Sequence, residues 1–146
     1  MGLAHRHLNT HQEAVRFDPA ALGARLEENL PEAVFCLLMG SASEGLVAPG
    51  SDLDLAFYLS GSRSLEFYLK VQEAAEAVVP GVRCDVGVLN GCEPVYRFEA
   101  LKGRLIFCRD PETYQGFFSL TCREYESQMA SYARQHRYRM EALSGR

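Results

Sequence analysis

The chain has 146 residues, of which 47% are hydrophobic and 10% aromatic, a composition typical of one globular domain. The longest apolar stretch, residues 33–39, is too short to cross a bilayer, and the amino terminus has no apolar run like that of a secretory signal, so we expect a cytoplasmic protein with no membrane contact. The net charge of -4 argues against a protein that binds nucleic acid directly, because phosphate contacts need a basic excess.

The first twelve residues are polar and include three histidines: His5, His7 and His11. A histidine cluster can bind a metal ion, but a short polar terminus more commonly forms a flexible tail. We therefore expect a flexible tail over residues 1–12 and a single domain over residues 13–146.

The first predicted helix begins at Asp18-Pro19, where Asp is a favoured N-cap and Pro suits the first helical position. Leucines four residues apart then share one face: Leu22, Leu26 and Leu30. Pro31 ends the helix. The continuous apolar run 33–39 (AVFCLLM) predicts a strand buried on both faces.

The next stretch, residues 40–51, is rich in small residues and predicts a loop or a short helix. Residues 53–59 alternate in polarity and predict a second strand. Its two faces divide as Leu53, Leu55 and Phe57 on one side, and Asp52, Asp54, Ala56 and Tyr58 on the other.

The rest of the chain predicts five more elements. They are a helix capped by Ser64 that runs to about Val79, a strand at 82–89 that carries Asp85, a helix near 94–102, a strand at 105–108 and a long final helix near 111–143. The order is helix, strand, strand, helix, strand, helix, strand, helix, which predicts an α/β fold with a mixed sheet flanked by helices.

Five cysteines are scattered along the chain: Cys36, Cys84, Cys92, Cys108 and Cys122. Their number is odd and no two form a C-x-x-C pair. This pattern indicates reduced, mostly buried thiols rather than a disulfide framework or a zinc site.

The first part of the candidate site is the pair Gly40-Ser41, which follows the predicted buried strand. Glycine lets the backbone approach a ligand closely. Exposed amides at the start of a helix suit a phosphate group, and the Ser41 hydroxyl adds another donor. Gly40 and Ser41 are therefore candidate phosphate-binding residues.

The second part is Asp52-x-Asp54, which ten residues separate from Ser41. Carboxylates two positions apart on a strand leave the same face, with their Cα atoms about 7 Å apart. Mg²⁺ prefers oxygen ligands, and two such ions about 3.5–4 Å apart can clamp an in-line phosphoryl displacement. Asp85 on the next strand is a candidate third ligand that also helps to deprotonate the attacking hydroxyl. An isolated D-x-D is a weak signal, but its combination with the glycine turn and two flanking strands is specific.

This arrangement of Gly40-Ser41, ten residues and Asp52-x-Asp54 resembles the signature of the minimal nucleotidyltransferases in the DNA polymerase β superfamily. Asp85, within Cys84-Asp85-Val86, resembles the third acid of that family. The stretches 97–110 and 123–125 are similar to the branch of the family whose members act as antitoxins. The resemblance covers about residues 20–140.

The resemblance implies a polymerase β-like fold, ATP as substrate and two Mg²⁺ ions. It also implies a partner, a HEPN-domain toxin that is an RNase, and transfer of AMP to a tyrosine of this toxin, which silences it. By the same resemblance Asp52, Asp54 and Asp85 are the catalytic residues and metal ligands, and Gly40 and Ser41 bind the nucleotide with Asp52 and Asp54. Two other functions stay open: transfer to a small molecule such as an aminoglycoside, and a non-catalytic antitoxin that neutralises its toxin by binding.

Several charged residues have two interpretations each. Glu44 stands where many relatives have a basic residue, and its carboxylate either opposes the triphosphate or faces solvent. Three basic residues either contact phosphates or are solvated surface charges: Lys102, Arg104 and Arg109. Three more, near the end of the last helix, either complement its dipole or form a docking surface: Arg134, Arg137 and Arg139.

Overall fold

The computed structural model describes residues 11–144, and its centre is a four-stranded sheet in the order β5-β4-β2-β6. The strands are β2 (Ala33–Leu38), β4 (Leu53–Leu59), β5 (Cys84–Val88) and β6 (Arg104–Cys108). β2 runs antiparallel to β4 and to β6, whereas β4 and β5 are parallel. The mixed sheet predicted from the sequence is confirmed. The predicted tail lies mostly in residues 1–10, outside the described residues.

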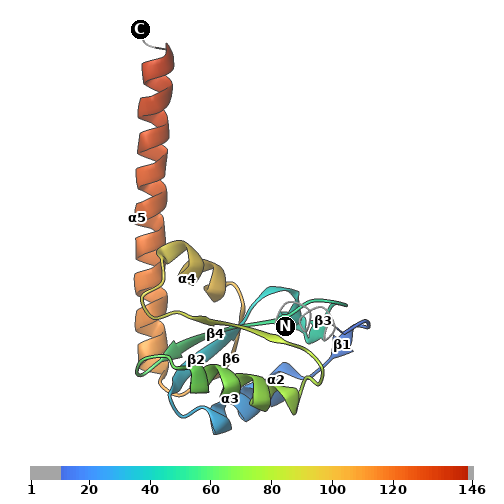
Figure 1. The fold of residues 1–146 in the computed structure, drawn as a ribbon. Helices are drawn as coiled ribbons and strands as arrows, with labels where there is room; N and C mark the ends of the chain where they lie inside the picture. Colours follow the sequence, from blue (N-terminus) through green and yellow to red (C-terminus); the bar gives the residue numbers. More distant parts are fainter. Residues whose placement is uncertain (1–10, 145–146) are drawn as a thin grey trace.

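Helices cover both faces of this sheet (Figure 1). On one face lie α2 (Pro19–Asn29) and α3 (Leu65–Glu76), and on the other lie α4 (Pro94–Leu101) and α5 (Pro111–Ser144). The order of the elements matches the prediction. The strand at β5 is shorter than the predicted 82–89, because its ladder with β4 is bounded by Cys84 and Val88.

The alternation along β4 divides the core as predicted. Leu53, Leu55 and Phe57 are buried in the cluster under α2 and α3. Ala56 and Tyr58 belong to the cluster under α4 and α5, where the Tyr58 ring stacks on Phe35 with centroids 5.3 Å apart. Both faces of the strand are therefore anchored by apolar packing, which fixes the direction of every side chain along it.

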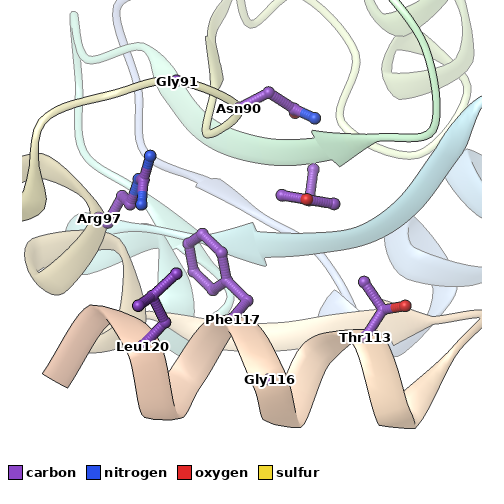
Figure 2. Close-up of a pocket in the computed structure, with 8 residues that line it drawn as sticks. Asn90, Gly91, Arg97, Thr113, Gly116, Phe117 and Leu120 are labelled. Atoms are coloured by element: carbon purple, nitrogen blue, oxygen red, sulfur yellow. The ribbon is translucent and has the colours of Figure 1, made fainter. Parts of the chain in front are cut away.

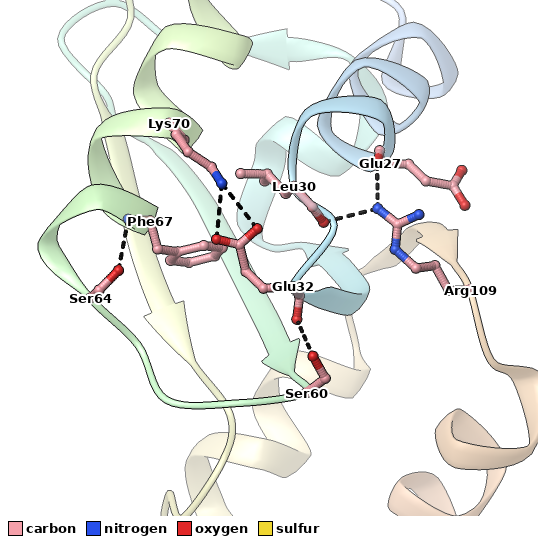
Figure 3. Close-up of polar contacts among 8 residues, drawn as sticks. All are labelled: Glu27, Leu30, Glu32, Ser60, Ser64, Phe67, Lys70 and Arg109. Carbon is pink, nitrogen blue, oxygen red and sulfur yellow. Dashed lines mark hydrogen bonds and ion pairs between the residues drawn. The ribbon is translucent and has the colours of Figure 1, made fainter.

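The ends of α2 are closed by polar contacts. At its start, the Asp18 carboxylate accepts a hydrogen bond from the Ala20 amide at 3.0 Å, as the capping prediction requires. At its end, the Arg109 guanidinium donates to the carbonyl of Leu30 at 2.9 Å and to that of Glu27 (Figure 3). It also donates to the Ala33 carbonyl at 2.8 Å. Arg109 therefore has a structural role that neither sequence interpretation anticipated, since it satisfies the free carbonyls of a helix terminus.

Two further polar contacts, both drawn in Figure 3, involve α3. The Ser64 hydroxyl accepts from the Phe67 amide at 3.2 Å, so Ser64 is the predicted cap. The Lys70 ammonium group lies 3.1 Å from a carboxylate oxygen of Glu32, which joins α3 to the turn before β2. The first contact closes the start of α3, and the second ties α3 to the chain that enters β2.

A two-stranded ladder lies beside the main sheet and was not predicted. β1 (Val15–Arg16) pairs antiparallel with β3 (Leu46–Val47), directly after the short 3-10 helix η1 (Gly40–Glu44). Strands of two residues are too short for an alternation pattern to be visible in a sequence. His11 also contacts this region, because its imidazole Nε2 lies 2.8 Å from the Ser51 carbonyl oxygen.

The last helix, α5, is 34 residues long. Its first turns pack against α4 and the sheet, and its later turns extend away from the rest of the chain (Figure 1). Several large side chains on this extension are exposed: Tyr132, Tyr138, Met140 and Leu143. Within residues 11–144, no helix combines the length and the apolar character needed to cross a bilayer.

Candidate active site

Two of the predicted acids lie next to each other at one end of the sheet. Asp54 on β4 and Asp85 on β5 are register partners in the parallel ladder. The Asp54 carbonyl also accepts a hydrogen bond from the Met39 amide at 2.9 Å, which brings the start of η1 to the same row. Asp85 on β5, Asp54 on β4 and Met39 just after β2 therefore form one row across the sheet. Met39 directly precedes the glycine turn.

The turn at Gly40 lies against the Asp54 carboxylate. Gly40 has a φ of 69°, in the left-handed region that favours glycine. A Cβ atom at this position would lie 3.6 Å from Asp54 Oδ2, so the missing side chain leaves the space in front of this carboxylate open. Gly40 and Asp54, which the sequence analysis selected separately, are therefore neighbours in the structure.

The carboxylates affect one another. Partial burial, repulsion from Asp85 and then from Asp52, and a hydrogen bond with Asp85 all raise the pKa of Asp54 above its ordinary value. Like charges this close are stabilised by a proton or by a cation, and such sites are commonly functional.

The third acid, Asp52, has a partner that the sequence analysis missed. One guanidinium nitrogen of Arg83, Nη2, donates to both carboxylate oxygens of Asp52 at 3.1 Å. Both side chains remain partly exposed, so water reaches the pair. The structure thus brings Asp54 and Asp85 together, and it holds Asp52 close to Asp54 but engaged with Arg83. Across the described part of the chain, no three His, Cys, Asp or Glu side chains converge as a ready-made metal site.

The short helix η1 presents Ser41 and Glu44 to solvent. The Arg104 guanidinium reaches this loop from β6 and donates to the Ser43 carbonyl at 3.2 Å. Lys102 is exposed and forms an ion pair with Glu99 at 3.0 Å. Of these two basic residues, Arg104 is therefore the one that lies beside the candidate phosphate site.

A tyrosine that the sequence analysis did not select lies behind the acids. The Tyr96 side chain extends from α4 toward β5, and its hydroxyl group donates to the Met39 sulfur at 4.0 Å. A Cβ atom built at Gly87 would overlap the Tyr96 hydroxyl oxygen. Burial, followed by the nearby Cys92, Asp85 and Asp54, raises the pKa of Tyr96. The available signal was Gly87, two residues after Asp85 on the same strand face.

A separate cavity of about 370 Å³ lies between α4, α5 and the far end of β4 (Figure 2). Its lining includes Arg97, Phe117 and Leu120, and none of the predicted site residues. Asn90, also in the lining, is bonded to the end of β4: its side-chain oxygen accepts from the Leu59 amide at 2.9 Å, and its side-chain nitrogen donates to the Leu59 carbonyl at 2.8 Å.

The chain matches the polymerase beta nucleotidyltransferase family over residues 24–112, more than half of its length. It belongs to this family. The matched region contains Gly40, Ser41 and all three predicted acids. No curated protein sequence matches the chain.

Solved structures with the same fold include three toxin–antitoxin complexes. A mutant MntA–HpeT complex matches with a TM-score of 0.66 at 15% identity, over 84% of this chain and 98% of the other. A toxin–antitoxin with AMP-PNP matches at 0.64 and 17%, again over 84% and 98%. The tri-AMPylated Shewanella oneidensis HEPN toxin in complex with MNT antitoxin matches at 0.59 and 17%, over 92% and 98%. At these identities the likeness establishes the fold alone.

Proposed function

We propose that this nucleotidyltransferase transfers AMP from ATP to a tyrosine hydroxyl of a HEPN-domain toxin and thereby acts as its antitoxin in the cytoplasm. The observation that carries the proposal is the Asp54–Asp85 pair beside the open turn at Gly40. The neighbouring complexes supply the chemical context, because one contains AMP-PNP and another contains an AMPylated HEPN toxin. The acting unit is a single domain over residues 13–146.

The nucleotide would bind at the turn after β2. Gly40 leaves room for the phosphates, the exposed Ser41 hydroxyl donates to them, and Arg104 beside the loop adds positive charge. Glu44 is also exposed, which is compatible with a carboxylate that faces solvent rather than the triphosphate.

The donor set of the site fits Mg²⁺, because the carboxylates supply hard oxygen ligands and their mutual repulsion favours a cation. Asp52, Asp54 and Asp85 would hold the ions, two of which are expected, once Asp52 is released from Arg83. When bound, the metal neutralises charge that develops on the phosphates. Arg83 lies at the edge of the acid group and keeps Asp52 ordered in its absence.

The protein's own groups then perform positioning and proton transfer. Asp85 lies on β5, one strand further from the glycine turn than Asp54. In the proposed reaction, the acceptor hydroxyl would approach from this side. The acceptor oxygen attacks the α-phosphorus, the Asp85 carboxylate takes the acceptor's proton, and pyrophosphate leaves.

The test uses ATP labelled at the α-phosphate, Mg²⁺ and a purified HEPN protein. A gene encoding a HEPN protein with an R-x-x-x-x-x-H motif, adjacent to the gene for this chain, would identify the cognate toxin. The wild-type chain should label the toxin, and the double variant Asp52→Asn with Asp54→Asn should remain folded but not label it. A double variant that still labels the toxin contradicts the assignment.

The same assay separates the alternatives. If the double variant suppresses the toxin's RNase activity as well as the wild type does, neutralisation occurs by binding and not by AMP transfer. If the label appears on an added aminoglycoside and not on the toxin, the acceptor is a small molecule.

A further inference from the structure

The Tyr96 hydroxyl occupies the position next to the acids on the same face of the sheet. Gly87, Ala56 and Leu37 form the row that follows Asp85, Asp54 and Met39 along the strands. The Tyr96 oxygen lies over Gly87 and contacts the sulfur of Met39. This phenol therefore lies one row behind the carboxylates, within the same site.

Small side chains create the space for this phenol. Gly87 has no side chain, and a Cβ atom there would overlap the Tyr96 oxygen. Its register partner on β4 is Ala56, which is fully buried. The Tyr96 residue is 37% exposed, although its hydroxyl lies over Gly87. Tyr58 differs from it, because the Tyr58 ring stacks on Phe35 at the edge of the core.

The chemistry of this group matches that of the acceptor in the proposed reaction. The Tyr96 hydroxyl lies over Gly87 on β5, the strand of Asp85, and contacts Met39, which follows β2 and directly precedes the candidate phosphate turn. The two strands are separated by β4, with Asp54 between them. A nucleotide bound at Gly40 would thus lie near both the acids and the phenol.

We propose that Tyr96 is an acceptor within the chain, and that the enzyme adenylylates its own Tyr96 when no toxin occupies the site. The inference rests on the proposed function, because it uses the same ATP site and the same acids. It adds a second acceptor and a form of self-regulation. A chain modified at Tyr96 carries an adenylyl group in the space that a toxin tyrosine must enter, so modification prevents further transfer until it is removed.

The bond changes balance without an additional reactant. The Tyr96 oxygen forms a bond to the α-phosphorus of ATP, and the bond from that phosphorus to the oxygen that bridges to the β-phosphate breaks. Pyrophosphate leaves with this bridging oxygen. The phenolic proton passes to the Asp85 carboxylate and then to water.

The test incubates the full chain, without toxin, with Mg²⁺ and ATP labelled at the α-phosphate. Label should appear on the chain, and tandem mass spectrometry should locate AMP on Tyr96. Tyr96→Phe keeps the ring and removes the acceptor oxygen, so it should lose at least nine-tenths of the label, as an order-of-magnitude expectation for removal of the nucleophile. Tyr58→Phe is the matched control, on the same sheet face but within the core, and should label like the wild type.

Three outcomes would overturn the inference: no label on the wild-type chain, equal label on Tyr96→Phe, or AMP located on another residue. A wild-type chain that labels the HEPN toxin but not Tyr96 overturns the inference and leaves the proposed function standing. A chain that labels neither protein removes the proposed function as well.

A second measurement does not depend on turnover. The compound α,β-methylene ATP cannot release pyrophosphate from its α-phosphorus, and with Mg²⁺ it should occupy the site without reaction. In protein with isotope-labelled tyrosine rings, its addition should shift the Tyr96 resonance, assigned from Tyr96→Phe. The resonances of Tyr132 and Tyr138 on the exposed end of α5 should not move. An unmoved Tyr96 resonance at a saturating concentration contradicts the placement of the phenol at the nucleotide.

Discussion

Asp54→Asn should abolish AMP transfer and at the same time make the metal-free protein more stable. Asp54 lies beside Asp85 in the ladder, and both Asp85 and Asp52 repel its charged form. Asparagine has nearly the same shape and removes the negative charge. Without a cation in the site, the substitution relieves the repulsion, so the free energy of unfolding should rise.

The magnitude follows from the position of the pair. Like charges directly opposite each other on neighbouring strands destabilise a sheet by about 0.2–1 kcal/mol. Asp54 is only partly buried, and the water that reaches it screens the repulsion, so we expect about 0.5 kcal/mol. For a chain of this size, that is a rise of roughly 1–3 °C in melting temperature.

The stabilisation by Asp54→Asn should depend on pH, in a direction set by the raised pKa of Asp54. The folded-state pKa of Asp54 lies above its ordinary value of 3.8, so between these two pKa values the folded chain holds a proton that the unfolded chain has lost. The contribution of Asp54 to stability therefore falls as pH rises through this window, and the loss is complete above the folded-state pKa. The difference between Asp54→Asn and the wild type should be absent at about pH 3 and fully present at about pH 7.

Urea titrations at several pH values, with EDTA present, measure this difference. Asp18→Asn is the matched control, because it also removes one carboxylate charge while asparagine keeps the capping oxygen of α2. Its effect should be near zero. With Mg²⁺ and ATP, the wild type should gain more stability than Asp54→Asn. A substitution at Asp54 that lowers stability at neutral pH, or a gain that does not change with pH, would refute the reasoning.

Three further predictions concern the loop and the helix ends. Ser41→Ala should weaken ATP binding more than Glu44→Lys changes it in either direction, because both residues are exposed but only Ser41 is expected at the phosphates. Isothermal titration of each variant with ATP and Mg²⁺ measures the two effects. A larger effect at Glu44 would mean that the phosphate site is misplaced. Arg109→Ala should lower the free energy of unfolding by about 1–3 kcal/mol in urea titrations, because it removes charged donors to the end of α2. The affinity for ATP should not change. An altered affinity would contradict this structural role. Asp110→Ala should lower the melting temperature at neutral pH, because Asp110 accepts from the Thr113 hydroxyl at 2.7 Å and its pKa is lowered by that contact. This loss should disappear as pH falls through the folded-state pKa of Asp110, and a loss that persists in acid would show that the charge is not involved.

The sheet and the acid pair were predictable because their signals are local. The apolar run of β2 and the alternation of β4 each specify a strand and its buried faces within a few residues. The same alternation predicts that Asp54 shares a face with Ala56 and Tyr58, and the structure confirms that these two pack under α4 and α5. Asp85 was selected because it lies on the next predicted strand and resembles the third acid of the family, and its pairing with Asp54 became visible only in the structure.

The residues that were missed depend on contacts between distant segments. Arg83 lies 31 positions from Asp52 and meets it only because β5 aligns in parallel with β4. Arg109 reaches the end of α2 because β6 crosses beside that helix, and its sequence neighbours give no indication of this. In each case the residue type was visible, but its partner depended on strand order, which a single sequence does not specify.

The position of Tyr96 shows why the site and the core cannot be treated as separate parts. One face of β4 carries Tyr58 in the apolar core, then Ala56, then Asp54 in the site. The large ring at one end holds the strand rigid, and the small side chain in the middle makes room for a phenol from another helix. The position of the Asp54 carboxylate therefore depends on the packing of Tyr58, two rows further along the same face of β4. A larger side chain at Ala56 or Gly87 would displace Tyr96 and so alter the surroundings of the acids, without replacing any of the acids themselves. A buried position can in this way influence which acceptor the active site takes.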